Sequence, residues 1–417
     1  MKILQVNKYY YPRGGADRYF LDLSAALEKA GHEVAVFAMQ HPKNTATPWS
    51  RYFVSRVSFN EGSLKNKLKI PGRVLYSREA KRKFTQLIKD FQPNIIHIHN
   101  IYHQLSPSIL DAAACFKIPV VMHLHDYKLI CPNHALFTEG AYCERCRPRR
   151  YSQCLKHRCV KNSLSASALA ALEMYLHHSV LKIYEKRISA FIAPSAFMKN
   201  TVGRFGQDEK KIRVIYNPYG QEFSSDNQTK EQTENKNTTD NNKEKYFLYF
   251  GRLSEEKGLS ILIQAAALAG QTVKLAGTGP EEAVLQTLAK NLKAPVEFLG
   301  LKTATELKPL ISNSQAVIIP SIWGENMPLS LLEAFSLGKP VIASNIGGMP
   351  EIVHNEVNGL LCNPGDVKDL AEKMLAISKL DGRALGKNAQ DTVRDLTPEK
   401  NTAAVLAVYQ ELIKKKK

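Results

Sequence analysis

Short apolar runs alternate with longer amphipathic segments along this chain of 417 residues. Near its start, Lys2–Asn7 predicts a strand, Ala16–Ala30 predicts a helix that Gly31 ends, and Val34–Met39 predicts a second strand. A strand, a helix and a further strand in this order are typical of a Rossmann-like α/β unit.

The second half of the chain contains a similar unit. Residues 246–250 are all apolar and predict a buried strand that Gly251 ends. Gly258 then precedes an apolar helix at Leu259–Ala269, and a glycine-rich turn at 277–280 follows another strand. We therefore expect two Rossmann-like domains of the α/β class.

Two cations lie in the loop after the strand at 246–250. Arg252 and Lys257 would stand at the carboxyl end of that strand, where open α/β sheets bind ligands. The planar arginine fork and the lysine point charge suit a diphosphate. In the alternative interpretation, this is a solvated loop whose cations pair with Glu255 and Glu256.

Two glutamates flank the predicted start of another helix. A proline is tolerated in the first helical turn, so Pro328 predicts a helix beginning near Met327, with Glu325 before it and Glu333 inside it. A buried carboxylate on this mostly apolar helix needs hydrogen-bond donors, which the two hydroxyls of a ribose would supply. The N–H groups at the helix start would bind an anion. These features indicate a sugar-nucleotide pocket, and the alternative is a buried helix with one partly exposed glutamate.

A glycine-containing loop follows the first strand. Gly14 and Gly15 lie in the segment 9–18, where the small residues let a ligand approach the backbone closely. The loop lacks the G-x-G-x-x-G spacing, which argues against a dinucleotide cofactor.

Two further predicted strands end in polar clusters. Residues 94–100 and 120–127 alternate apolar and polar positions, and His99 and His125 fall at the carboxyl tips of the two strands. Functional groups gather at this end of a parallel sheet. The earlier histidine of each strand is interpreted as an ordinary strand residue.

A polar stretch separates the two halves. Residues 223–245 contain one hydrophobic residue and cannot build a core, so we expect a mobile linker between an N-terminal domain at 1–222 and a C-terminal domain at 246–397. No apolar run reaches the length of a membrane-spanning helix, and the chain starts with a strand rather than a signal peptide. We therefore expect a cytoplasmic protein.

The positive charge is concentrated in the first half. Residues 1–222 contain 34 Lys and Arg against 16 Asp and Glu, whereas residues 223–417 contain 23 of each. Such a charge attracts phospholipid headgroups, a phosphate-bearing acceptor or nucleic acid. Apolar residues lie between the basic ones, which favours binding to an anionic membrane surface. The sequence shows no nucleic-acid-binding motif of the usual spacing, which argues against nucleic acid as the partner. The alternative is a basic surface without a specific partner. The basic clusters are Lys65–Lys69, Arg78–Lys83 and Arg145–Arg150, and the apolar residues are Leu64, Leu68, Ile70, Val74, Leu75 and Tyr76.

Five of the seven cysteines fall within residues 131–159, which we interpret as a Cys-rich insertion in the basic domain. Two short-spaced pairs of thiolates would suit a tetrahedral structural zinc ion, and reduced thiols packing a loop are the alternative. Cys115 and Cys362 are interpreted as core residues. The predicted zinc ligands are Cys143, Cys146, Cys154 and Cys159.

Taken in order and spacing, these motifs resemble the family 4 retaining glycosyltransferases, and the resemblance covers essentially the whole chain. One departure from the family is visible, because Asn326, Met327 and Pro328 follow Glu325 where the family often has Phe-Gly. The motifs that carry the resemblance in the donor half are Arg252 with Lys257, Gly277-Thr-Gly279, Glu325 with Glu333, and Gly347-Gly348 with Glu351.

The resemblance implies the GT-B fold, in which two Rossmann-like domains face each other across a cleft. It also implies that the last helix, at about 398–414, returns to the N-terminal domain. The expected reaction transfers a sugar from a nucleotide diphosphate-sugar to an acceptor hydroxyl with retention. The chain contains no Asp-x-Asp motif, which agrees with an enzyme that uses no catalytic metal.

The resemblance also implies residue roles. Arg252 and Lys257 neutralise the leaving diphosphate, Glu325 contacts sugar hydroxyls, His125 contacts the transferred sugar and Glu333 binds the ribose. The other expected donor contacts are Gly14, Gly15, Gly251, Gly277, Gly279, Asn326, Met327, Pro328 and Leu329. The expected acceptor-side residues are Arg18, His99, Asn100 and Asp126.

Charge and resemblance together predict a lipid-linked or other glycan acceptor of an envelope, capsular or exopolysaccharide pathway, and a peripheral position on the inner face of the membrane. Two alternatives share the pocket. One is a GT-B epimerase or phosphorylase, and the other is a non-catalytic, membrane-associated scaffold that binds nucleotide.

Overall fold

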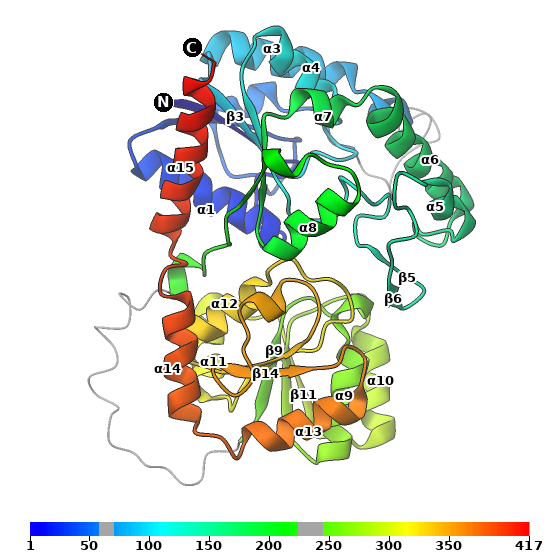
Figure 1. The fold of residues 1–417 in the computed structure, drawn as a ribbon, viewed down its shortest axis with the longest axis vertical. Coiled ribbons are helices and arrows are strands. Elements are labelled where there is room, and N and C mark those ends of the chain that lie inside the picture. The colour runs from blue at the N-terminus through cyan, green and yellow to red at the C-terminus, as the bar shows by residue number, and fades with distance from the viewer. Residues whose placement is uncertain (58–70, 224–244, 417) are drawn as a thin grey trace. The chain divides into compact units, whose positions relative to one another are not determined.

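A computed structural model describes residues 1–57, 71–223 and 245–416. The chain divides into two compact units (Figure 1). Unit 1 comprises Met1–Thr138, Cys143–Ile215 and Asn401–Lys417, and unit 2 comprises Glu139–Tyr142 and Tyr216–Lys400. Within the described residues, the strands form two six-stranded parallel sheets and one two-stranded sheet. Parallel strands joined through helices on both faces make this an α/β protein.

The sheet of unit 1 has the strand order β2-β1-β3-β4-β7-β8, so the order reverses between β1 and β3. Its strands are β1 Lys2–Val6, β2 Glu33–Phe37, β3 Ile95–Ile98, β4 Val120–His123, β7 Ala190–Ala193 and β8 Ile212–Val214. Its helices are α1 Gly15–Lys29, α3 Arg78–Phe91, α4 Ser108–Cys115, α5 Ser152–Lys156, α6 Leu164–Met174, α7 Ile183–Arg187 and α8 Ala196–Arg204. The short strands β5 Phe137–Thr138 and β6 Ala141–Tyr142 pair within the Cys-rich segment.

The sheet of unit 2 has the order β11-β10-β9-β12-β13-β14, which is the Rossmann arrangement with a reversal between β9 and β12. Its strands are β9 Phe247–Phe250, β10 Val273–Ala276, β11 Val296–Gly300, β12 Val317–Ile319, β13 Val341–Ser344 and β14 Gly359–Cys362. The helices after β9 are α9 Leu259–Ala269, α10 Glu282–Leu292, α11 Ala304–Asn313, α12 Leu329–Ser336, α13 Val367–Ile377, α14 Gly382–Val393 and α15 Pro398–Lys414.

One face of the first sheet is covered by helices from opposite ends of the chain. Tyr19 of α1 and Val405 and Tyr409 of α15 pack with Ile3 and Val121 of the strands in one apolar cluster. Figure 1 shows α1 and α15 side by side on this face. The last helix therefore completes the core of unit 1.

The second sheet is buried on both faces. Helices α9, α10 and α13 contribute to the apolar cluster on one face, and α11, α12 and α14 contribute to the cluster on the other. Burial on both faces explains why the strand at 246–250 is an unbroken apolar run.

Most elements have the expected bounds, and α12 differs. The helix α9 spans Leu259–Ala269 as predicted, whereas α12 begins at Leu329, two residues later than expected. Pro328 lies at the N-cap with an extended ψ of 128°, and its carbonyl accepts the first hydrogen bond of the turn from Leu331 N at 3.1 Å. The proline thus precedes the helix instead of occupying its first turn.

Three further expectations concern the surface. No helix in the described part of the chain is both long and apolar enough to cross a membrane. Cys115 was expected in the core but is exposed, because it is the last residue of α4, whereas Cys362 is buried as expected. The basic cluster Lys65–Lys69, with Leu64, Leu68 and Ile70, lies outside the described residues.

Candidate functional site

The candidate donor residues follow four neighbouring strands of unit 2. The loops after β9 and β12 carry Arg252 and Lys257 on one side and Glu325 on the other, directly at the reversal of strand order. The loops after β10 and β13 lie next to them in the sheet. Open α/β sheets bind ligands outside the carboxyl ends of the strands at such a reversal.

Lys257 and Glu325 form the centre of this region. Lys257 Nζ lies 2.5 Å from Glu325 Oε1, and Ser321 Oγ donates a hydrogen bond to the same oxygen at 2.8 Å. Lys257 Nζ also lies 5.3 Å from the ring centroid of Trp323, a cation–π contact. Although burial opposes ionisation, Lys257 and the hydrogen bonds hold the pKa of Glu325 below its ordinary value. The carboxylate is therefore ionised and ordered before any ligand binds.

Lys257 does not pair with Glu255 or Glu256 of its own loop, which was the alternative interpretation. Glu256 accepts a hydrogen bond from Ser254 Oγ at 2.6 Å, and Lys257 reaches across to Glu325. Arg252 is exposed, and the Tyr249 hydroxyl donates to its carbonyl oxygen at 2.8 Å. The loop therefore holds its backbone through Tyr249 and presents the arginine side chain to solvent.

Glycines allow the loops at this edge to touch. Gly277 has a φ of +146°, and a Cβ atom there would lie 1.8 Å from the carbonyl oxygen of Gly251. Gly347 has a φ of +73°, and its Cβ would lie 2.2 Å from the carbonyl oxygen of Glu325. Gly348 N donates to that same carbonyl at 2.7 Å. Larger residues would push these loops apart, so the glycines hold the backbone of Glu325 in place.

Helix α12 positions the second glutamate. Glu333 lies in its second turn with only 4% of its surface exposed, and Asn326 and Met327 are also buried. Asn217 Nδ2 donates to the carbonyl oxygen of Met327 at 3.3 Å and so ties the segment before the helix to the rest of unit 2. Pro328 and Leu329 at the helix start are partly exposed.

In unit 1, the loop after β1 leads into α1. Gly14 is the N-cap residue, its backbone is extended, and a Cβ atom there would meet no atom of the described residues within 4 Å. Packing against the described part of the chain thus gives no reason for a glycine at this position. Arg18 N donates to the Gly14 carbonyl at 3.0 Å, and the Arg18 side chain pairs with Asp22 at 3.7 Å.

Histidines from β3, β4 and the loops after them form a stack in unit 1. His97, His99 and His123 are buried and His125 is partly buried. The rings of His123 and His125 are stacked with centroids 4.4 Å apart, and those of His99 and His125 are 5.1 Å apart. Burial lowers the pKa of His97 to about 3 and that of His125 to about 4. All four rings are therefore neutral at neutral pH, because burial also lowers the pKa values of His99 and His123.

Hydrogen bonds connect this stack to residues that the sequence patterns did not single out. His99 Nδ1 lies 2.8 Å from His125 Nε2, and His99 Nε2 lies 2.9 Å from Gln5 Oε1. Gln5 Nε2 donates to the Tyr409 hydroxyl at 3.4 Å. Gln5 is a polar residue inside an apolar strand, a signal that would have drawn attention to it. Ser321 and Trp323 were missed because they acquire their role only through Lys257 and Glu325.

The remaining acceptor-side candidates have local structural partners. Asn100 is buried, its carbonyl oxygen accepts from Lys8 N at 2.7 Å, and its own N–H donates to Asn7 Oδ1 at 3.1 Å. Asp126 Oδ1 accepts a hydrogen bond from Lys128 N at 2.8 Å. These contacts stabilise the loops that follow β3 and β4.

The cysteine sulfurs form no metal-binding group of three or more in the described residues. The group of His, Cys, Asp or Glu whose ligand atoms lie within 4.8 Å of one another there is His97, His99 and His123. The Cys154 thiol donates a weak hydrogen bond to the carbonyl oxygen of Ser167, with the sulfur 3.9 Å from that oxygen. The predicted zinc ligands therefore form no preassembled site in the described structure, and a zinc ion at these cysteines stays a prediction.

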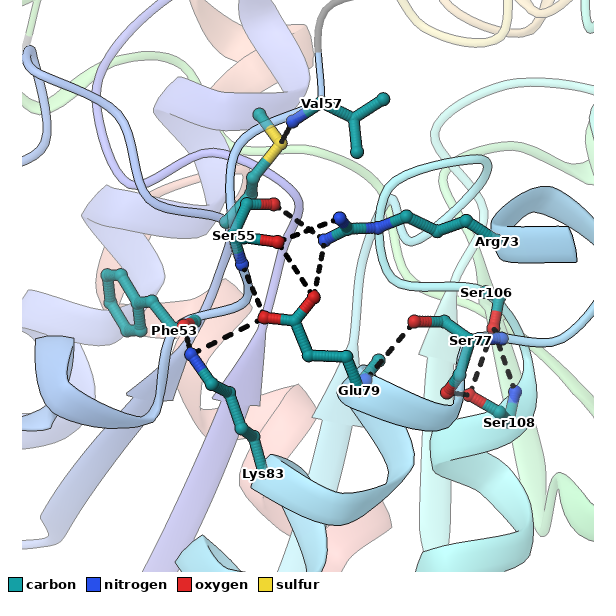
Figure 2. Close-up of polar contacts among 11 residues, drawn as sticks. Phe53, Ser55, Val57, Arg73, Ser77, Glu79, Lys83, Ser106 and Ser108 are labelled. Atoms are coloured by element: carbon teal, nitrogen blue, oxygen red, sulfur yellow. Dashed lines mark hydrogen bonds and ion pairs between the residues drawn. The ribbon is translucent and has the colours of Figure 1, made fainter. Parts of the chain in front are cut away.

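Glu79 of α3 is the centre of a polar network in the basic region (Figure 2). Its carboxylate accepts two hydrogen bonds from Ser55, each 2.8 Å long, and lies 3.4 Å from Arg73 and 3.5 Å from Lys83. The apolar residue Val74 is buried here, so it does not contribute to the surface as expected. Part of the positive charge of this region is thus balanced internally.

Exposed positive charge remains on α3. Arg78 and Arg82 are exposed, and Arg82 borders a hollow of about 580 Å³. The hollow is lined by Arg51, Tyr52, Arg82, Lys83, Gln86 and Asp90.

Comparison with known proteins covers both units. The profile of the family described as "Glycosyltransferase Family 4" matches residues 13–220, and that of "Glycosyl transferases group 1" matches residues 230–395. The chain is 34% identical over 142 residues to the putative colanic acid biosynthesis glycosyltransferase WcaL of Escherichia coli, which is 31% of this chain and 35% of WcaL. It is 25% identical to the glycogen synthase of Mycobacterium tuberculosis over 90% of this chain and 86% of that enzyme.

A solved structure matches over the full length. HepE of Anabaena, crystallised in complex with UDP, is 20% identical to this chain. The two structures superpose with a TM-score of 0.66 over 99% of this chain and 100% of HepE. This likeness shows the GT-B fold.

The sequence matches span about a third to a half of the length of the first curated relatives. The two family profiles together match about nine tenths of the sequence, and this chain therefore belongs to glycosyltransferase family 4.

Proposed function

We propose that this protein is a retaining glycosyltransferase that moves a sugar from a nucleotide diphosphate-sugar to a hydroxyl of a glycan acceptor. The observation that carries the proposal is the pairing of Lys257 with the buried Glu325, beside the exposed Arg252, at the strand-order reversal of unit 2. A lysine and an arginine at this place suit a diphosphate, and the carboxylate beside them suits sugar hydroxyls.

Lys257 and Arg252 act on the leaving group. In the reaction, the bond between the anomeric carbon and the diphosphate oxygen breaks, a bond from the anomeric carbon to the acceptor oxygen forms, and the hydroxyl proton of the acceptor passes to the departing diphosphate. Negative charge develops on the diphosphate, so fixed cations there stabilise the transition state more than the bound substrate. Lys257 is already ordered by Glu325 and Trp323, which reduces the reorganisation that donor binding requires.

The two glutamates bind hydroxyl groups. Glu325 is ionised and accepts hydrogen bonds only, so the sugar hydroxyls donate to it. We assign Glu333 to the ribose, since a buried carboxylate on an apolar helix is matched by two adjacent hydroxyl donors. His125 contacts the transferred sugar as a neutral ring. The start of α12, from Asn326 to Leu329, and the glycine-rich loops receive the phosphates.

The acceptor and the location follow from charge and relatives. WcaL is named for colanic acid biosynthesis, which supports a glycan acceptor in cell-envelope polysaccharide synthesis. The exposed Arg78 and Arg82 of α3 suit phosphate groups of a lipid-linked acceptor or an anionic membrane. We therefore propose a cytoplasmic enzyme bound peripherally to the membrane, without a catalytic metal.

The test is release of nucleoside diphosphate from a panel of UDP-, GDP- and ADP-sugars, with and without a membrane extract. Extract-dependent release from one donor, with retained anomeric configuration in the product, is the expected result. Nucleotide binding without release from any donor would overturn the proposal in favour of a scaffold. Release of a free epimerised sugar nucleotide, or of a sugar phosphate, would indicate an epimerase or a phosphorylase.

A further inference from the structure

Gln5 occupies a position in which its amide must be satisfied internally. It lies in β1, is 0% exposed, and faces the same side of the sheet as its β3 neighbour His97. A buried amide without hydrogen bonds is costly, and both ends of this one are engaged. Its oxygen meets His99 Nε2 at 2.9 Å and its nitrogen meets the hydroxyl of Tyr409, on α15, at 3.4 Å.

The hydroxyl of Tyr409 sets the direction of these hydrogen bonds. It lies 2.6 Å from His97 Nδ1, a length typical of a hydroxyl donor and short for an N–H donor. Tyr409 therefore donates to His97, and its oxygen is available as the acceptor for Gln5 Nε2. This orientation directs Gln5 Oε1 towards His99, so the amide can only accept there.

The direction continues through the histidines. Because Gln5 Oε1 accepts, His99 carries its proton on Nε2, and in a neutral imidazole the other nitrogen is then an acceptor. His125 Nε2, 2.8 Å from His99 Nδ1, must donate to it and therefore carries the proton. The Nδ1 atom of His125 is in turn an acceptor nitrogen.

We propose that Gln5 and His99 are positioning residues that hold His125 as the neutral tautomer with its proton on Nε2, so that a hydroxyl of the donor sugar donates to His125 Nδ1. The sugar contact rests on the proposed function, whereas the tautomer rests on unit 1 alone. Helix α15 thus has a role beyond packing, because Tyr409 orients the amide of Gln5 and that amide orients the ring of His99. The sugar contact implies a donor sugar with a free hydroxyl at the contacted position.

A metal ion is a poorer explanation of the same histidines. The nitrogens of His97, His99 and His123 are close enough to share an ion, but the rings of His99 and His123 are stacked at an interplanar angle of 10°. The lone pairs of an imidazole lie in the ring plane, so stacked rings direct them along parallel planes instead of at one point. His99 also has both nitrogens in hydrogen bonds. The chain of hydrogen bonds from Tyr409 through Gln5 and His99 to His125, called the relay below, accounts for the partners of His99 without an ion.

The direct test is a ¹⁵N NMR spectrum of the full-length protein with labelled histidine, recorded without substrate. The His125 signals, identified by their loss in a His125→Gln variant, are expected to show a protonated Nε2 and an unprotonated Nδ1. Protonation on Nδ1, or a charged ring at neutral pH, would overturn the relay. Since no substrate is present, a failure to observe turnover would count against the proposed function and would leave this result unaffected.

Variants connect the tautomer to turnover. Gln5→Met removes both amide hydrogen bonds and retains an unbranched apolar chain. No hydrogen bond then keeps the proton of His99 on Nε2, so the NMR signals of His125 should show a mixture of both tautomers. We expect turnover of the donor to fall about tenfold, the worth of one hydrogen bond. With the monodeoxy donor analogue that lacks the contacted hydroxyl, wild type and variant should turn over equally. An equal loss with every analogue would refute the sugar contact.

His123→Phe is the matched control. His123 is buried, as Gln5 is, and its ring is stacked on that of His125, but its nitrogens have no hydrogen-bond partner among the described residues. The phenyl ring preserves the stacking and leaves the relay intact, so the His125 spectrum should be unchanged. A tautomer mixture in this variant would show that stacking, and not Gln5, holds the ring.

Discussion

Replacing Lys257 by Met tests the role of the ion pair at the centre of unit 2. The methionine retains the length of the side chain but removes the charge that faces Glu325. The carboxylate of Glu325 is buried and would then keep Ser321 as its neighbouring hydrogen-bond donor, together with its Trp323 contact. We expect both stability and turnover to fall, for separate reasons.

The magnitude of the stability loss follows from burial. Removing one partner of a fully buried ion pair costs about 3–5 kcal/mol, because the other charge is left uncompensated. Here the Lys257 side chain is 21% exposed and that of Glu325 is 7% exposed, so water replaces part of the lost interaction. We therefore expect the free energy of unfolding of unit 2 to fall by about 2–3 kcal/mol. Turnover should fall by about a hundredfold or more, the usual effect of removing one group that stabilises transition-state charge.

The assay combines urea unfolding with nucleoside diphosphate release, for each single variant and for the double variant Lys257→Met/Glu325→Gln. Glutamine at position 325 removes the unpaired charge, so the double variant should recover most of the lost stability. It should not recover activity, because the cation that faces the diphosphate is still missing. Arg252→Ala serves as the comparison, since this exposed residue should affect turnover with little effect on stability.

The pH dependence provides an independent check. The pKa of Glu325 is depressed in the folded protein, so its stabilising effect is present above the unfolded pKa and is lost as the pH falls through the folded value. The difference in stability between wild type and Lys257→Met should therefore shrink in acid. A Lys257→Met protein with unchanged stability would show that the ion pair does not stabilise unit 2, and a double variant that regains turnover would show that Lys257 does not act on the diphosphate.

Three further outcomes are expected. The pKa of His97 is about 3 in the folded protein, so protonation below the unfolded pKa favours the unfolded state. Lowering the pH from about 7 to about 5 should therefore reduce the free energy of unfolding by about 2 kcal/mol through His97 alone, and His125 acts in the same direction. Urea unfolding at both pH values measures this change, and an unchanged midpoint would contradict it. Glu333→Gln should weaken binding of nucleoside diphosphate about tenfold, measured by calorimetry, because an amide oxygen is a weaker acceptor for ribose hydroxyls than a carboxylate. Replacing Arg78 and Arg82 by Glu should reduce binding to vesicles containing anionic lipid, and added salt should weaken binding of the wild type; binding that is insensitive to both would exclude this surface.

The local patterns of the chain were sufficient for the fold and for part of the site. The apolar run before Gly251 and the glycine at 258 predicted β9 and α9, because burial on both faces of a parallel sheet leaves an unbroken apolar strand. The order of strands and helices predicted two Rossmann-like units, and the family profiles and the HepE structure confirm the GT-B fold. The polar residues at strand ends could be selected because a parallel sheet brings its carboxyl ends to one edge.

Other features depended on contacts that local patterns do not encode. The sequence placed Lys257 and Glu325 in separate roles, and only the reversal of strand order between β9 and β12 brings them within 2.5 Å. Pro328 predicted a helix start correctly to within two residues, but its extended ψ, which depends on the loop packing before α12, decided the boundary.

Local sequence was enough to identify which segments form strands and helices, where charge is concentrated and which residues stand at strand ends. These properties depend on neighbours along the chain, so periodicity and turn residues reveal them. Which of those residues contact one another depends on how the elements pack. Gln5 and Tyr409 are separated by 404 positions, yet they share a hydrogen bond because α15 packs on the sheet that β1 belongs to. A hydrogen bond between such distant positions depends on strand order and helix packing, which are properties of the assembled core.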